Sequence, residues 1–196
     1  MNILFLTLSF SRERGLYTDL VKELSSRGHE IYVVTPIERR YKKNTRMFNL
    51  DNIKILEIRT GNLQKVNKIE KGISTILFEK SIINGIKKYI SNVKFDLVLY
   101  STPPITLYNV IKYVKKRDGC IAYLMLKDIF PQNAVDLGMF RKKSLLHKFF
   151  RKKEVKLYNI SDYIGCMSEG NKEYILSNNI YLNKEKVELL PNTITP

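Results

Sequence analysis

Short apolar segments alternate with longer amphipathic segments along nearly the whole chain, and this alternation restricts the possible folds more than any other feature. The apolar segments are rich in Ile, Val, Leu and Tyr and are expected to be strands buried on both faces. They span residues 2–8, 30–35, 53–59, 95–101, 120–126, 162–167 and 186–190. Segments with helical spacing lie between them, at about 16–24, 69–90, 105–116, 142–160 and 169–177. Repeated strand–helix–strand units predict an α/β, Rossmann-like fold with a mainly parallel sheet and helices on both faces.

The chain length predicts one domain over residues 1–196. A chain of 196 residues can bury one good-sized core but is too short for two ordinary domains. Gly28 is expected to close the first helix, and Ser168 to cap the helix that begins at Glu169. Residues 38–50 are expected to form a mobile, solvated loop, because they contain five basic residues, Arg39, Arg40, Lys42, Lys43 and Arg46.

The sequence predicts neither a disulfide nor a membrane span. Cys120 and Cys166 lie far apart in apolar segments, as expected of buried cysteines in a reducing compartment without a zinc site. No stretch approaches the ~18 uninterrupted apolar residues that a spanning helix needs.

Ligands of such sheets bind beyond the carboxyl ends of the strands, so the loops that follow the strands are the candidate sites. The first loop, residues 9–15, has a single glycine, Gly15, where a dinucleotide-binding protein carries GxGxxG, and this argues against a nicotinamide or flavin enzyme. Gly15 could still present backbone N–H groups to a phosphate, with Arg12 or Arg14 adding positive charge. A turn glycine beside solvated arginines explains the same residues equally well.

Asp128 is the candidate for chemistry, because it follows the apolar strand 120–126 almost directly. A carboxylate at the tip of a central strand can bind a hydroxyl, orient an acceptor or accept a proton. The structural alternative is an aspartate that pairs with Lys127 or caps the following turn. Pro131 fixes the turn in either case.

The charge balance favours a polyanionic partner. With 34 Lys and Arg against 19 Asp and Glu, the formal net charge is +15. Nucleic acid, an anionic membrane surface or a phosphorylated substrate would each suit this charge, and solvated lysines with no partner would also explain it. A nucleic-acid-binding domain is therefore one class of function to consider, although the chain lacks a recognisable recognition helix or aromatic stacking motif.

Much of this charge lies in the predicted helix 142–160. Its apolar residues share one face, and the basic residues Lys148, Arg151 and Lys152 flank that face. The pattern is typical of a helix lying on anionic lipid, with these three residues facing the membrane. A crossover helix that buries its apolar stripe against the sheet produces the same pattern, and both can hold together.

Several segments, taken in order, resemble the N-terminal half of retaining GT-B glycosyltransferases. They are the opening strand, residues 27–35 (RGHEIYVVT), 126–138 and 161–169, together with the ending 186–194 (KVELLPNTI). The resemblance is to the family 4-like amino-sugar and hexose transferases of O-antigen, colanic acid and capsule pathways. Their loop commonly reads Arg-Asp-Leu-Trp-Pro-Glu-Ser, and residues 127–133 read KDIFPQN here. Asp128 and Pro131 match, whereas Gln132 replaces the acid.

This resemblance implies the acceptor-side domain of a sugar transferase that builds a bacterial surface polysaccharide. In the family, a C-terminal domain holds most of the nucleotide-sugar donor, and the sequence to Pro196 contains none of that domain. We therefore expect the chain to need this missing domain, or a partner chain, and to be inactive alone. We expect the acceptor to be a saccharide linked to lipid, and the protein to lie in the cytoplasm, peripherally on the inner face of the plasma membrane.

The resemblance also implies roles for individual residues. The family mechanism is usually independent of metal, and with no DxD motif we expect neither a metal nor another cofactor. Asp128 would orient the acceptor or stabilise oxocarbenium charge, and Gly15 and Arg14 would face the donor diphosphate. The expected acceptor-binding residues are Lys127, Arg12 and Thr102.

A third class of function fits the same sequence. The chain could be a non-catalytic subunit that docks on the membrane and recruits a separate catalytic chain, as in split GT-B transferases. Co-purification with such a partner would discriminate between the two.

Overall fold

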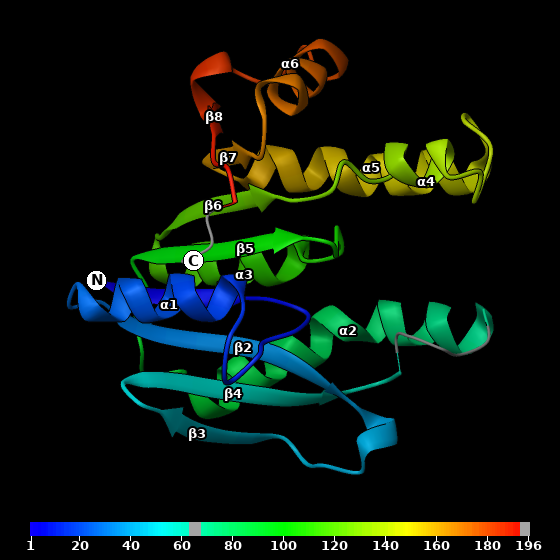
Figure 1. The fold of residues 1–196 in the computed structure, drawn as a ribbon. Coiled ribbons are helices and arrows are strands. Elements are labelled where there is room, and N and C mark those ends of the chain that lie inside the picture. The colour runs from blue at the N-terminus through cyan, green and yellow to red at the C-terminus, as the bar shows by residue number, and fades with distance from the viewer. Residues whose placement is uncertain (63–67, 193–196) are drawn as a thin grey trace.

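A single eight-stranded sheet organises the molecule (Figure 1). The structure, a computed structural model, describes residues 1–62 and 68–192. The sheet order is β3-β4-β2-β1-β5-β6-β7-β8, and every neighbouring pair is parallel except β3 and β4. This confirms the predicted α/β fold with a mainly parallel sheet. The strands are β1 (Asn2–Leu6), β2 (Glu30–Glu38), β3 (Arg46–Leu50), β4 (Ile53–Thr60), β5 (Leu97–Thr102), β6 (Ile121–Leu126), β7 (Tyr163–Cys166) and β8 (Val187–Leu189).

Helices cover both faces of this sheet, as predicted. The first helix packs on one face of the sheet. The second, third and fifth helices pack on the other face, and the sixth helix contributes to the same core as these three. The helices are α1 (Leu16–Ser26), α2 (Lys68–Tyr89), α3 (Tyr108–Asp118), α4 (Gln132–Asp136), α5 (Leu145–Ile160) and α6 (Glu169–Asn178), with 3-10 turns η1 (Arg39–Tyr41) and η2 (Lys184–Lys186).

The two-sided burial of the strands explains why they have no alternation of polar and apolar residues. In β1, Leu4 and Leu6 enter the core on the α2, α3 and α5 side, whereas Ile3 and Phe5 enter the core under α1. All four side chains are at most 2% exposed. A strand that is buried on both faces must be apolar at every position.

The predicted helix boundaries follow from local capping. Gly28 has φ +83° and donates its N–H to Ser25 O, which closes α1 in a conformation that glycine adopts without strain. Ser168 caps α6 by accepting a hydrogen bond from the Asn171 N–H at 3.2 Å. Both predictions are confirmed.

The predicted solvated loop at 38–50 is wrong. Strand β2 continues to Glu38, η1 follows, and residues 46–50 form the edge strand β3, antiparallel to β4. Met47 packs on the core below α2, and Phe48 packs on the core below α1, so even this edge strand contributes to both faces. The basic residues suggested a loop rather than a strand, but an edge strand can carry charged side chains because one of its sides faces solvent.

Candidate functional site

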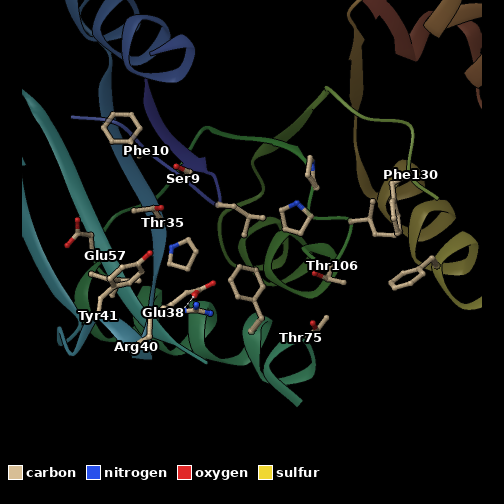
Figure 2. A pocket seen from close by; sticks show the side chains of 18 residues that line it. Ser9, Phe10, Thr35, Glu38, Arg40, Tyr41, Glu57, Thr75, Thr106 and Phe130 are labelled. Carbon is tan, nitrogen blue, oxygen red and sulfur yellow. Dashed lines mark ion pairs between the residues drawn. The ribbon is translucent and has the colours of Figure 1, made fainter. Parts of the chain in front are cut away.

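A pocket of about 860 Å³ lies at the carboxyl ends of β1, β2 and β5 (Figure 2). Helix α2 forms one wall, and the segment from β6 into α5 forms another. Figure 2 shows Glu57, Glu38 and Arg40 toward one end of this pocket and Phe130 at the other, with Phe10 on the Glu57 side and Thr75 and Thr106 on the Phe130 side. The polar end is lined by Thr35, Glu38, Arg40, Tyr41 and Glu57, and the apolar end by Phe78, Pro103, Pro104, Ile105, Phe130 and Phe150.

Ion pairs build the polar end. Glu57 accepts hydrogen bonds from Arg12 at 2.6 Å and from Arg46 at 2.7 Å, and Glu38 pairs with Arg40 at 2.6 Å. Burial raises the pKa of Glu57, but the hydrogen bonds and charges of Arg46 and Arg12 outweigh burial and hold that pKa below its usual value. The polar end therefore carries an ionised carboxylate that is fixed in place.

Arg12 belongs to this ion-pair cluster. Its guanidinium also lies over the Phe48 ring, 4.7 Å from the centroid. The predicted acceptor-binding residue thus supports the pocket wall through Glu57. Direct contact between Arg12 and an acceptor stays a prediction.

Aromatic packing builds the apolar end. Phe130 meets Phe150 edge to face at 4.9 Å between ring centroids, and Phe140 lies 6.2 Å from Phe130 and 6.1 Å from Phe150. Phe149 continues the row, 5.3 Å from Phe150. The row leads from the pocket to the surface of α5, because Phe149 is 52% exposed.

Thr102 holds the backbone of the loop that carries Asp128. Its hydroxyl oxygen accepts hydrogen bonds from the N–H groups of Lys127 at 3.1 Å and Asp128 at 3.3 Å, and the hydroxyl donates to Asp128 O at 3.2 Å. Thr102 is only 1% exposed. The hydroxyl is used between the neighbouring strands β5 and β6, and the predicted acceptor-binding role of Thr102 stays a prediction. Asp128 itself is exposed at the carboxyl edge of the sheet.

Lys127 joins this loop to the end of the last strand. Its ammonium donates to Asn192 Oδ1, and Asn192 Nδ2 contacts Met167 Sδ at 3.2 Å. Burial lowers the pKa of Lys127, so its amine holds the proton less tightly than the amine of a fully solvated lysine does. The predicted acceptor-binding role of Lys127 stays a prediction.

The loop after β1 lies at the same edge of the sheet. Gly15 precedes the first turn of α1, and its carbonyl accepts the Asp19 N–H at 2.9 Å. A Cβ at Gly15 would lie 3.5 Å from Ser11 Cβ, which is an ordinary contact, so packing alone does not demand glycine there. The predicted roles of Gly15 and the exposed Arg14 toward a donor diphosphate stay predictions.

The three predicted membrane-facing residues separate in the structure. Lys148 and Lys152 are exposed, but the Arg151 guanidinium turns toward the protein. It bonds Glu154 at 2.6 Å, Asn178 O at 2.9 Å and Asn179 Oδ1 at 2.5 Å. The buried Glu154 carboxylate needs a charged partner, and Arg151 supplies it. The predicted membrane-facing role of Arg151 stays a prediction. Within 1–62 and 68–192, no helix is both long and apolar enough to cross a bilayer.

Solved structures of nucleotide-sugar enzymes share this fold, although the sequence matches no known protein family and no curated protein. A structure described as trehalose-6-phosphate from E. coli, bound with UDP-2-fluoro glucose, superposes on 100% of this chain with a TM-score of 0.69 at 9% identity. Sucrose-phosphate synthase from Thermosynechococcus elongatus gives 0.59 at 10% identity over 97% of the chain. UDP-GlcNAc 2-epimerase from Methanocaldococcus jannaschii gives 0.54 at 12% identity over 98%.

The chain spans about half the length of these proteins, namely 50%, 47% and 46% of the three chains. The fold is that of one Rossmann-like half of a GT-B enzyme. Because an epimerase shares this fold with synthases, the fold alone does not decide the reaction. Function must be argued from the pocket.

Sequence reasoning missed the polar end of the pocket. Glu38, Arg40 and Tyr41 fell in the segment predicted to be a solvated loop. A signal was present, because Glu57 is the single acid within the apolar strand 53–59, and a charge in a buried strand needs a partner. Phe150 was predicted on the apolar face of its helix, but not as part of a pocket.

Proposed function

We propose that this chain is the acceptor-side half of a glycosyltransferase that moves a sugar from a nucleotide-sugar donor to a saccharide acceptor linked to lipid. A second Rossmann-like domain, in the same polypeptide or another, would hold most of the donor. The observation that carries the proposal is the two-ended pocket at the carboxyl edge of the sheet. Asp128 is exposed at the same edge, although it does not line the pocket. One end suits a hydroxylated sugar and the other suits an apolar tail.

Solved structures with the same fold support a nucleotide-sugar donor. Two of them contain bound UDP-2-fluoro glucose and UDP-L-rhamnose. For this chain we propose a donor whose diphosphate lies near Gly15 and the N-terminus of α1, where backbone N–H groups and the helix dipole favour negative charge. Arg14 would add positive charge there.

The proposed reaction exchanges one bond to the sugar for another. The bond from the anomeric carbon to the donor phosphate breaks, the acceptor oxygen bonds to that carbon, and the departing phosphate takes the hydroxyl proton. We propose retention at the anomeric carbon, with Asp128 orienting the acceptor hydroxyl or stabilising positive charge on the sugar. Thr102 positions this loop through the backbone, so the Asp128 carboxylate stays available to substrate.

The finer assignment follows the loop at 127–133. Its Asp128 and Pro131 support membership of the group that builds capsule, O-antigen or colanic acid, with the protein on the inner face of the plasma membrane. A non-catalytic docking subunit is the competing proposal. It predicts that Asp128 is dispensable for sugar transfer.

Deletion of the coding sequence from the source cells tests the proposal. Membranes of the deleted strain should lose incorporation of label from at least one nucleotide [¹⁴C]sugar into lipid-extractable material, and the wild-type coding sequence should restore it. Asp128→Asn should lower the restored rate by roughly 10²–10⁴-fold. Asp51→Asn is the matched control, because Asp51 is an exposed acid in the β3–β4 turn, where β4 begins and thus away from the pocket.

Three outcomes would contradict parts of this proposal. Unchanged incorporation after deletion, for every nucleotide sugar tried, would overturn the transferase assignment. Full restoration by Asp128→Asn would favour the docking subunit. Sugar transfer by purified residues 1–196 alone would overturn the division of donor and acceptor between two halves.

A further inference from the structure

The end of α5 that points away from the sheet exposes large apolar side chains. In Figure 1, α4 and the start of α5 project beyond the carboxyl ends of the strands, on the side where the pocket lies. We call residues 137–149 the α5 tip. Its exposed apolar side chains are Leu145 at 86%, Leu137 at 76%, Met139 at 69%, Phe149 at 52% and Leu146 at 48%. Such a concentration of exposed apolar side chains is typical of a binding surface, whereas single exposed apolar residues are ordinary.

The same region has no acidic residue. Residues 137–153 contain seven Lys and Arg and no Asp or Glu. A basic groove of about 590 Å³ runs along the adjoining face of α5. It is lined by Lys143, His147, Lys148, Arg151, Lys152, Val155 and Lys156. Six of the seven basic residues are outside the Glu154 ion pair, which engages Arg151.

The opposite half of α5 behaves differently, although its sequence pattern is the same. Leu157 and Tyr158 are at most 1% exposed and pack into the core with the sheet. The sheet therefore covers the apolar stripe of α5 only at the C-terminal end of the helix. At the other end only Phe150 packs on the core, and Leu145, Leu146 and Phe149 remain 48–86% exposed.

We propose that the α5 tip inserts its apolar side chains into an anionic lipid bilayer while the flanking lysines contact the phospholipid phosphates. Charge decides the occupant: a bilayer surface rich in phosphate complements the basic residues that are interspersed with the exposed apolar residues in 137–153, and apolar side chains anchor at the acyl boundary. A second copy of this chain would instead bring two strongly basic tips together, which like-charge repulsion opposes.

This docking deepens the proposed function and rests on it. The row of rings from Phe149 through Phe150 to Phe130 joins the inserted surface to the apolar end of the pocket. A lipid-linked acceptor could thus reach the pocket along an apolar surface while its tail remains in the bilayer. The α5 tip supplies the entrance for the acceptor, and the polar end of the pocket lies farther from the membrane.

A single tryptophan tests insertion directly, because the chain has none. Phe149→Trp should show a blue-shifted emission with vesicles of phosphatidylcholine and phosphatidylglycerol, and brominated lipid should quench it. Ile121→Trp is the control, since Ile121 is 45% exposed at the start of β6, at the opposite edge of the sheet. Its emission should be unaffected by either lipid.

Vesicle sedimentation separates the two contributions. Leu145→Asn with Phe149→Asn, and separately Lys148→Glu with Lys152→Glu, should each lower partitioning onto anionic vesicles at least tenfold. The charge control is Lys22→Glu with Lys116→Glu, two exposed lysines on α1 and α3 that change the net charge equally. This control should keep most of the binding. Circular dichroism and thermal melts should show that all variants fold, because the four altered residues, of which Lys152 lies just beyond the tip, are exposed.

The proposal fails if wild-type chain does not sediment with anionic vesicles, if both pairs of tip variants bind as wild type does, or if the control pair loses as much binding as the tip pair. Equal binding to pure phosphatidylcholine would exclude the anionic surface. Light scattering that shows a dimer broken by Leu145→Asn with Phe149→Asn, without vesicle binding, would assign the tip to a second copy. Vesicle binding needs no sugar transfer, so a loss of vesicle binding would leave the transferase proposal standing. A failure of sugar transfer with intact vesicle binding would overturn only the transferase proposal.

Discussion

The two ends of the pocket are maintained by different physical forces. At the polar end, Glu57 is fixed by two arginines, and Glu38 by a third. At the apolar end, packing of Phe130, Phe140 and Phe150 forms the wall, which continues to the surface of α5. Charge pairs respond to pH, whereas ring packing responds to lost volume. The difference indicates a ligand with a polar and an apolar part, and it can be tested end by end.

The largest effect on stability is expected from Phe150→Ala. Phe150 contacts three other phenylalanine rings, so truncation removes buried area and leaves a gap, which should cost about 2–4 kcal/mol of unfolding free energy. Phe149→Ala should cost less than about 1 kcal/mol, because this ring is half exposed. Urea unfolding followed by circular dichroism measures both. Equal losses would show that the apolar end is not held by packing at Phe150.

Glu57→Gln should have the next largest effect, about 1–3 kcal/mol at neutral pH, because Arg12 and Arg46 lose an ionised partner. The folded-state pKa of Glu57 is lowered, so its contribution is present above the unfolded pKa of ~4.3 and is lost as pH falls through the folded value. Between neutral pH and that value, the advantage of wild type over Glu57→Gln should shrink with acid. Melts at several pH values measure it.

Phe150→Ala is the control for this pH dependence. Its difference from wild type should stay constant over the same range, because no titrating group is removed. A Glu57→Gln protein that shows the same acid sensitivity as wild type would contradict the assignment of that sensitivity to the polar end.

Thr102→Val tests the connection between the pocket and Asp128. The loss of a buried hydroxyl with three hydrogen bonds should cost about 1–2 kcal/mol of stability. It should also lower sugar transfer beyond what the loss of folded protein explains, because the loop of Asp128 is less well positioned. Thr102→Ser should rescue both. Loss of stability without any loss of transfer would make Thr102 purely structural.

The smallest effect on stability is expected at the surface of the α5 tip. Leu145→Asn should change the free energy of unfolding by less than about 0.5 kcal/mol, because the side chain is 86% exposed. A loss of more than 1 kcal/mol would mean that the tip packs against the protein and is not available to a bilayer.

The sheet could be predicted from the sequence because strands buried on both faces leave continuous apolar segments. The ends of elements were predictable where one residue decides them, as at Gly28 and Ser168. Strand β3 could not be recognised, because an edge strand needs only a few apolar contacts, here from Met47, Phe48 and Leu50, and its charges suggested a loop.

The site was less predictable, because its contacts join residues far apart in the sequence. Arg12 reaches Glu57, 45 positions away, and Arg151 reaches Asn179, 28 positions away. Spacing along one helix cannot show that Arg151 turns inward while Lys148 does not. The position of Asp128 at the carboxyl edge was predictable from its place after a strand, since the topology alone brings strand ends to one edge, whereas its role stays a prediction.

The most direct test of the central claim is a titration of the ¹⁵N-labelled chain, followed by amide NMR, with octyl β-D-glucoside below its micelle concentration and, separately, with UDP-glucose. If the chain holds the acceptor, the glucoside, which has a sugar and an apolar tail, should shift amides at both ends of the pocket, including Thr35, Thr106 and Phe130. UDP-glucose should affect at most the loop around Gly15. Pocket amides that respond to UDP-glucose and not to the glucoside would contradict the assignment of this chain to the acceptor side.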